Sequence, residues 1–346
     1  MKSIQAIDLF CGAGGLSYGL LSEGINVIAG VDIDACCKFP YEKNIGASFI
    51  EKSVSDISSN DLNHFWKEPS SQYTLLAGCA PCQTFSQYNA KASPEDKRWF
   101  LLNHFQRLME EMEPDFVTME NVPGLMEHPV YDMFLASLEN KGYFTDSNLV
   151  DCTRYGLAQT RSRLVLIASK LGPIKLISPD EFGAPIQTVR DVIGGLPKIE
   201  SGKTHNADPL HSCSQLSDLN MKRIKASLPN GSWRDWPDEL VAKCHRKSSG
   251  KSYPSVYGRM SWDSPSPTIT TQFYGFGNGR FGHPDQDRAL SLREGALLQG
   301  FPVSYEFTPP DSPIPRRVIG RMIGNAVPVT LGRVIARSFI LHSQQQ

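Results

Sequence analysis

Short apolar segments alternate with helical segments through the first half of the chain, and this alternation restricts the fold more than any other feature. The apolar segments 4–10, 27–31, 75–78, 116–119 and 164–168 have the length and composition of buried strands. Apolar residues also recur at helical spacing, at Leu101, Leu102, Phe105, Leu108, Met109 and Met112. Strands that alternate with amphipathic helices predict an α/β fold with a Rossmann-like, doubly wound parallel sheet. Such sheets bind ligands at the carboxyl ends of their strands.

The pattern changes after residue 170. Residues 172–287 are rich in Pro, Gly, Ser, Trp and Tyr and contain few long helical patterns. This composition predicts a second, smaller domain that is irregular and rich in β-structure. Helical character returns at 290–299, and the last segment, from 327 to about 342, is amphipathic.

Charge is unevenly distributed along the chain. The 346 residues carry a net charge of −1, but residues 1–150 carry −10 and the remainder +9. Basic residues outnumber acidic ones between 198 and 260, where they alternate with Trp233, Trp236, Tyr253, Tyr257 and Trp262. This pattern favours a nucleic-acid surface in the second half of the chain. Two alternatives stay open: a chance uneven surface, and a thin core filled by the aromatic rings.

The eight cysteines are irregularly spaced, and no secretory signal precedes them. This usage predicts a reducing, cytoplasmic compartment rather than a disulfide framework. Cys79 and Cys82 form a C-x-x-C pair, but no second pair completes a zinc pattern. A redox pair is the less favoured interpretation. We expect no membrane association, because no uncharged apolar run is long enough to cross a bilayer.

A glycine-rich segment, Asp8 to Leu16, follows the first strand and opens a helix. Glycines there allow a ligand to approach the backbone closely, although many such turns carry glycine for packing alone. Asp32, at the end of the second strand, could bind ribose hydroxyls. Asp56 could accept from an adenine amino group, and Phe10 could stack on the ring. Adenosine is therefore the expected ligand moiety, and the missing G-x-G-x-x-G spacing argues against a dinucleotide.

Cys82 follows Pro81 just after the strand 75–78. A thiolate at such a strand end is a candidate nucleophile, and a small buried apolar residue is the alternative. The hydrophilic stretch 83–98 is long for a loop, which favours a lid that closes over a substrate.

A carboxylate and two guanidiniums follow at the ends of further strands. Glu120 ends the apolar strand 116–119, where a carboxylate needs a partner or a task. Arg161 and Arg163 lead into the strand 164–168, and alternation would point both into one cleft. A capping acid and a surface arginine pair are the alternatives. With Cys82, these groups suit attack of a thiol on a polarised heteroaromatic ring.

Taken together, the motifs resemble the C5-cytosine DNA methyltransferase family, in the family's order and over nearly the whole chain. The matching segments are 8–20, 80–83, 120–122, 159–163, 288–302 and 324–328. The resemblance implies a catalytic, cofactor-binding domain at 1–171 plus 324–346. It implies a small domain at 172–323, with a target-recognition region at about 172–287.

The resemblance also implies a reaction and roles for the residues that match. Cys82 would attack C6 of a cytosine rotated out of double-stranded DNA. Glu120 would hydrogen-bond N3 and the exocyclic amine, Arg163 would assist near the base carbonyl, and Arg161 would support the site. S-adenosylmethionine would give its methyl group to C5 and leave as S-adenosylhomocysteine, with no metal involved.

Further residues match the family's binding positions. The implied cofactor residues are Phe10, Gly12, Gly14, Gly15, Leu16, Asp32, Ile33, Asp56, Ile57, Leu101, Asn325 and Val327. Gln83 and Ser86 would contact DNA, and Thr270 would contact a phosphate beside the target nucleotide. Candidate base readers are Arg223, Arg234, Arg246, Arg259 and Asn230.

The predicted function is therefore sequence-specific DNA cytosine-5 methylation by a monomeric enzyme, acting alone or with a restriction endonuclease in a restriction-modification system. The tRNA-directed branch of the family is one alternative, but its Cys-Phe-Thr motif is absent. A non-catalytic DNA-binding relative is another. Such a protein would be expected to have lost Cys82 or Glu120, and both are present.

Overall fold

The computed structural model of the chain describes residues 3–67, 73–81 and 100–345. It forms two compact units. Unit 1 comprises Met1–Tyr155, Ser162–Ala184 and Ala326–Gln346, and unit 2 comprises Gly156–Arg161 and Pro185–Asn325. These boundaries differ from the sequence-derived limits, which place the divisions at 171/172 and 323/324. The roles assigned to the two domains stay predictions.

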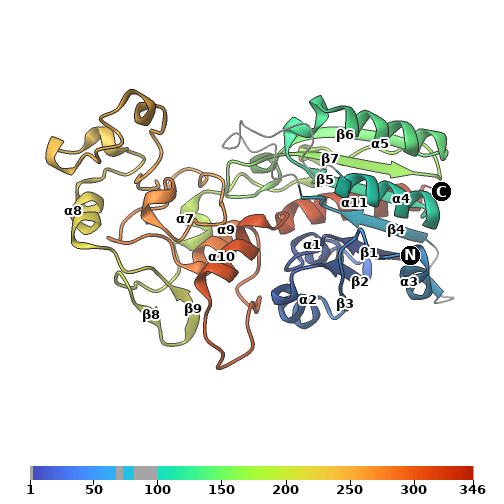
Figure 1. Cartoon of the computed structure of the whole chain (residues 1–346), viewed down its shortest axis with the longest axis horizontal. Helices are drawn as coiled ribbons and strands as arrows, with labels where there is room; N and C mark the ends of the chain where they lie inside the picture. The colour runs from blue at the N-terminus through green and yellow to red at the C-terminus, as the bar shows by residue number, and fades with distance from the viewer. Residues whose placement is uncertain (1–2, 68–72, 82–99, 346) are drawn as a thin grey trace. The chain divides into compact units, whose positions relative to one another are not determined.

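A seven-stranded sheet forms the centre of unit 1, in the order β3-β2-β1-β4-β5-β7-β6 (Figure 1). The neighbouring pairs from β3 to β5 are parallel, whereas β7 is antiparallel to both β5 and β6. The strands are β1 Ile4–Leu9, β2 Asn26–Asp32, β3 Ser48–Glu51, β4 Tyr73–Gly78, β5 Phe116–Asn121, β6 Phe144–Asp151 and β7 Ser162–Ser169. The α/β fold class is confirmed, but the sheet is mixed rather than fully parallel.

Helices cover both faces of this sheet. On β5, the ring of Phe116 packs against Phe339 of the last helix, with 5.0 Å between ring centroids. The next residue, Val117, joins a buried cluster with Phe105 and Phe134 from two other helices. The helices of unit 1 are α1 Gly15–Ser22, α2 Lys38–Ile45, α3 Ser59–Asn63, α4 Phe100–Met112, α5 Pro129–Asn140, α6 Pro179–Phe182 and α11 Val329–Gln344, with 3-10 helices η1 Ala35–Cys37, η2 His64–Lys67, η4 Pro123–Glu127 and η5 Cys152–Tyr155.

The predicted apolar stripe lies on α4. Leu102, Phe105, Leu108 and Met109 are buried in the core, while Leu101 and Met112 are half-buried. The stripe therefore serves as the core face of α4, as the spacing predicts.

Helix α11 returns the end of the chain to unit 1, where it packs against α1. A side chain on Gly19 would place its Cβ 2.4 Å from the carbonyl oxygen of Val329, so this close approach requires glycine. Glu23 adds ion pairs to Arg333 and Arg337 of α11, at 2.8 and 2.9 Å.

One stretch of the described chain, Arg316–Gln344, is long and apolar enough to span a membrane by length and composition. It consists of two helices that are separated at 326–328. Two thirds of its most apolar window (67%) is buried inside the protein. This burial is usual for core helices, so the stretch is weak evidence for a membrane span.

Unit 2 is irregular, in line with its composition. Its described residues form one two-stranded antiparallel sheet, isolated β-bridges and short helices. The elements are β8 Thr204–His205, β9 Asp208–Ser212, α7 Val189–Ile193, α8 Asp218–Ala226, α9 Leu292–Leu298, α10 Arg316–Asn325, η6 Trp233–Asp235, η7 Asp238–Leu240, η8 Ser248–Ser252 and η9 Phe276–Asn278. Trp233 and Trp236 are buried in a small core with Phe276. Trp233 and Trp236 therefore fill a thin core, which was the alternative interpretation of the aromatic residues.

Buried ionic groups stabilise unit 2 where regular strands are few. The guanidinium of Arg259 donates to the carbonyl oxygens of Ile224 and His283 and pairs with Asp287 at 2.7 Å. Arg288 is fully buried and donates to both carboxylate oxygens of Glu294, at 2.8 and 2.6 Å. Burial alone would raise the pKa of Glu294, but Arg288 lowers that pKa to about 2.

Candidate active site

The glycine-rich segment after β1 forms a turn that holds Asp32. Phe10, Gly12 and Gly14 have φ values of 59°, 51° and 87°, which is uncommon for the phenylalanine. The backbone N–H groups of Gly12 and Asp34 donate to the two carboxylate oxygens of Asp32, at 2.8 and 2.9 Å. Desolvation raises the pKa of Asp32. The turn therefore fixes a partly buried carboxylate at the carboxyl end of β2.

Other predicted cofactor residues lie at varied depths. Ile33 follows Asp32 and is 73% exposed, which is unusual for an isoleucine beside a structured turn. Leu16 and Ile57 are buried, so their side chains contribute to the core. Asp56 is exposed.

The two predicted cofactor residues near the end of the chain, Asn325 and Val327, lie in different units. A Cβ on Gly15 would lie 2.2 Å from the carbonyl oxygen of Val327, so these two predicted residues are in contact. Asn325 is exposed and belongs to unit 2. Its neighbour Gly324 packs against the backbone of Thr270, because a Cβ there would lie 2.4 Å from the Thr270 carbonyl carbon. The motif 324–328 is therefore divided between the units.

Asp8 lies beneath the glycine-rich turn and was assigned no role from the sequence. It is fully buried and accepts a hydrogen bond of 2.6 Å from the Ser17 hydroxyl, which also contacts the hydroxyl of Tyr41. Desolvation raises the pKa of Asp8 to about 7. The signal in the sequence is a carboxylate inside a strand that is mostly apolar and fully buried.

Glu120 lies near the end of β5 and is 2% exposed. Its Oε1 pairs with Nε of Arg163 at 2.9 Å, and its Oε2 accepts from the thiol of Cys79 at 2.7 Å. Arg163 reaches Glu120 because β7 is antiparallel to β5, so β7 begins where β5 ends. The guanidinium therefore comes from the start of β7 and meets the carboxyl end of β5 because the two strands are antiparallel. The contribution of Cys79 was missed.

Arg161 makes contacts in unit 2, whereas Arg163 pairs with Glu120 in unit 1. It precedes β7 and belongs to unit 2, so alternation along a strand does not apply to it. Its side chain is buried, and its Nη1 donates to Oε1 of Gln159 at 3.3 Å and to the carbonyl oxygen of Ile269 at 3.2 Å. The expectation that both arginines face one cleft stays a prediction.

Asn121 supports the segment that leads to the predicted nucleophile. Its Nδ2 donates to the carbonyl oxygen of Ala80 at 3.0 Å, and its Oδ1 accepts from the N–H of Val122 at 2.8 Å. Cys82, together with Gln83, Ser86 and the rest of the predicted lid 83–98, lies outside the described residues.

The predicted base readers of unit 2 divide by burial. Arg234 and Arg246 are exposed, as are Asn230 and the predicted phosphate contact Thr270. Arg223 is buried, with its guanidinium over the rings of Trp236 and Tyr257. Arg259 is committed to the internal contacts described above. Base reading by these two arginines stays a prediction, although Nε and Nη1 of Arg223 and the guanidinium of Arg259 make hydrogen bonds inside the unit.

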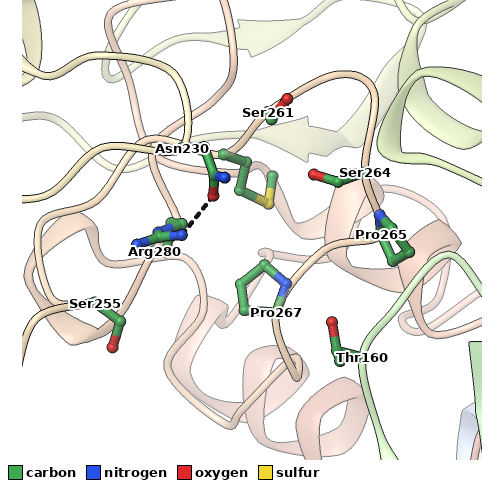
Figure 2. A pocket seen from close by; sticks show the side chains of 9 residues that line it. Thr160, Asn230, Ser255, Ser261, Ser264, Pro265, Pro267 and Arg280 are labelled. Atoms are coloured by element: carbon green, nitrogen blue, oxygen red, sulfur yellow. Dashed lines mark hydrogen bonds between the residues drawn. The ribbon is translucent and has the colours of Figure 1, made fainter.

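Unit 2 also contains a cavity of about 370 Å³ (Figure 2). Its lining consists of Thr160, Asn230, Ser255, Met260, Ser261, Ser264, Pro265, Pro267 and Arg280. Figure 2 shows Arg280 and Asn230 joined by a hydrogen bond on one side of the cavity. The sequence analysis did not single out Arg280. Within the described ranges, no group of three or more His, Cys, Asp or Glu side chains could hold a metal ion.

Comparison with known proteins assigns the chain to a family. The model of the C-5 cytosine-specific DNA methylases matches residues 4–341. The chain belongs to this family. It is 52% identical over 335 residues to the Type II methylase M.HgiDII of Herpetosiphon aurantiacus, covering 96% of this chain and 94% of that protein. It is 31% identical to the Type II methyltransferase M1.BsuMI of Bacillus subtilis, covering 97% and 80%.

Solved structures agree on the fold of this methylase. A crystal structure of a prophage-encoded DNA modification methyltransferase of Escherichia coli superimposes with a TM-score of 0.76 at 23% identity, covering 99% of this chain and all of that one. The Entamoeba histolytica methyltransferase EhMeth gives a TM-score of 0.67 at 15% identity. At these identities the likeness concerns the fold alone.

Proposed function

We propose that this methylase is a sequence-specific DNA (cytosine-5-)-methyltransferase that acts on a flipped-out cytosine in double-stranded DNA. One observation carries the proposal beyond family membership. Glu120 is buried and pairs with Arg163 at the carboxyl end of β5. The segment Cys79–Pro81, which leads from β4 to Cys82, begins at the same end of the sheet. A buried, oriented carboxylate beside the approach to a thiol suits activation of a pyrimidine ring.

In the proposed reaction, the Cys82 thiolate forms a bond to C6 of the cytosine. Electron density moves to C5, where bound S-adenosylmethionine would supply the methyl group as its S–CH3 bond breaks and would leave as S-adenosylhomocysteine. Transfer of the C5 proton to solvent then restores the double bond and expels Cys82 as a thiolate. The Glu120 carboxyl, with a proton taken up from solvent, donates to N3 and accepts from the exocyclic amine, which favours the first step by stabilising the electron density that the thiolate adds to the ring.

The two carboxylate oxygens of Glu120 have different partners. Oε1 forms an ion pair with Nε of Arg163 at 2.9 Å, which holds the carboxylate by charge attraction. Within the described residues, Oε2 accepts from the Cys79 thiol, and a thiol is a weak donor. We therefore propose that Oε2 exchanges the thiol for the cytosine edge, while Arg163 keeps the carboxylate in place.

Members of this family use S-adenosylmethionine, which supplies the methyl group. The turn after β1 fits its adenosine part. Asp32 offers a fixed carboxylate for ribose hydroxyls, and the exposed side chain of Ile33 beside it offers an apolar surface for adenine. We propose Phe10 and the glycines 12, 14 and 15 as the remaining wall. No metal is required by this proposal.

The biological setting follows from the relatives. Because two of them are named Type II enzymes, we propose that this methylase belongs to a restriction-modification system with a cognate endonuclease. We propose a monomer that acts on DNA in the cytoplasm.

Transfer of a tritiated methyl group from S-adenosylmethionine tests the proposal, with DNA and tRNA offered separately. DNA is expected to be labelled at C5 of cytosine and tRNA is not. Cys82→Ser is expected to abolish labelling, and Glu120→Gln to reduce it at least about a hundredfold. Cys244→Ser, which alters an exposed thiol without an assigned role, is the matched control. Labelling of tRNA alone, or full activity of Cys82→Ser, would refute the proposal.

A further inference from the structure

The cavity in unit 2 has a lining suited to an anion. Four hydroxyl groups border it, from Thr160, Ser255, Ser261 and Ser264, and no carboxylate does. The nearest acid in sequence, Asp263, is paired with Arg190 at 2.8 Å. Among the residues that line the described cavity, Arg280 is the charged one. Hydroxyl, amide and guanidinium groups are those that contact phosphate oxygens in protein–DNA complexes.

Arg280 is held in a defined position at this cavity. Its side chain lies over Gly258, where an added Cβ would be 2.8 Å from Cγ of Arg280. Its Nη1 donates to Oδ1 of Asn230. Its Nε is buried and makes no hydrogen bond within the described part of the chain. A guanidinium that is positioned but incompletely paired favours a ligand that brings acceptor oxygens.

Asn230 is fixed by the same scaffold. It has a φ of 59°, and its N–H donates to the carbonyl oxygen of Arg259 at 3.0 Å. Isolated bridges join Pro229 to Arg259 and Arg259 to Gly282, so three segments lie side by side around the buried Arg259 guanidinium. Because Oδ1 of Asn230 accepts from Arg280, the Nδ2 group remains as a donor. The pair thus presents N–H groups from a rigid support.

We propose that Arg280 and Asn230 form a binding site for one phosphate group of the DNA backbone. The proposal rests on the proposed function and adds a contact that nothing in the sequence motifs assigns. Guanine reading by the Nε and Nη2 edge of Arg280 is the competing assignment, and binding to several unrelated duplexes separates it from a phosphate contact. As a phosphate contact, the site contributes affinity that is independent of DNA sequence.

The salt dependence of binding tests this assignment. Binding of the full-length protein to several unrelated duplexes is measured at a series of salt concentrations. The slope of log affinity against log salt is negative, and Arg280→Gln is expected to make it less steep by about 0.9, the value for one lost phosphate contact. At about 0.1 M salt the affinity should fall roughly eightfold on every duplex. Arg317→Gln removes an exposed charge of the same unit and is expected to leave the slope unchanged.

Two results would overturn the inference: a slope equal to that of Arg317→Gln, or a loss confined to duplexes that contain the methylated sequence. Arg280→Lys guards against misfolding, since it keeps the charge and is expected to restore the slope. If the wild-type protein neither binds nor methylates DNA, the proposed function fails. If it does both and Arg280→Gln behaves like the control, only the phosphate site fails.

Discussion

The buried carboxyl of Asp8 makes the stability of unit 1 depend on pH in a direction that can be measured. The pKa of Asp8 is raised by desolvation from 3.8 to about 7. The folded state therefore keeps its proton between these values, while the unfolded state releases it. The contribution of protonated Asp8 to the free energy of unfolding is fully present below the pKa of the unfolded state, and it is lost as the pH rises through about 7. The difference corresponds to roughly 4 kcal/mol.

Asp8→Asn removes this titration and keeps the shape of the side chain. Unfolding by urea is followed for both proteins from about pH 5 to about pH 8, and the difference between them is plotted. The wild type is expected to lose stability relative to the variant as the pH rises. Other groups cancel in the difference, including His283, whose pKa is lowered by desolvation to about 4. A difference that does not change with pH would refute the reasoning.

Two further predictions concern close contacts. Cys79→Ala removes a donor that competes with the cytosine edge for Oε2, so kcat at saturating DNA is expected to stay within about twofold, whereas Cys79→Ser supplies a stronger donor and should raise KM for DNA; a loss of kcat of about tenfold for Cys79→Ala would contradict the exchange of the thiol for the base. Gly19→Ala is expected to destabilise unit 1 by roughly 1–3 kcal/mol, because its Cβ meets Val329, whereas Gly195→Ala has no neighbour within 4 Å and should be neutral. Matching thermal unfolding midpoints would contradict the tight packing of α1 on α11.

Local patterns predicted the parts of the fold that local physics determines. The strands β1, β2, β4 and β5 are mostly apolar because most of their residues are buried, and α4 carries a regular stripe. The strand β6 was missed because it lies at the edge of the sheet and its sequence, FTDSNLVD, is largely polar. The direction of β7 was also missed, since strand direction depends on the path of the chain between strands.

The site shows the same division between local and long-range information. Glu120 and Arg163 stand out as charges beside apolar strands, and the structure pairs them. The contact of Cys79 with Glu120 joins residues that are 41 positions apart and has no local signal. Composition likewise cannot tell which arginines are used internally. Arg223 and Arg259 hold unit 2 together, while Arg280 faces the cavity.

Covalent trapping tests the central claim, the transient bond between Cys82 and the cytosine ring, most directly. DNA in which 5-fluorocytosine replaces cytosine is incubated with the protein and S-adenosylmethionine, because fluorine cannot leave C5 as the proton does. We expect a complex that survives denaturation, requires the cofactor, maps to the Cys82 peptide and is absent for Cys82→Ser. An enzyme that methylates ordinary DNA yet forms no such complex, or a bond that maps to another residue, would rule out the proposed bond to Cys82.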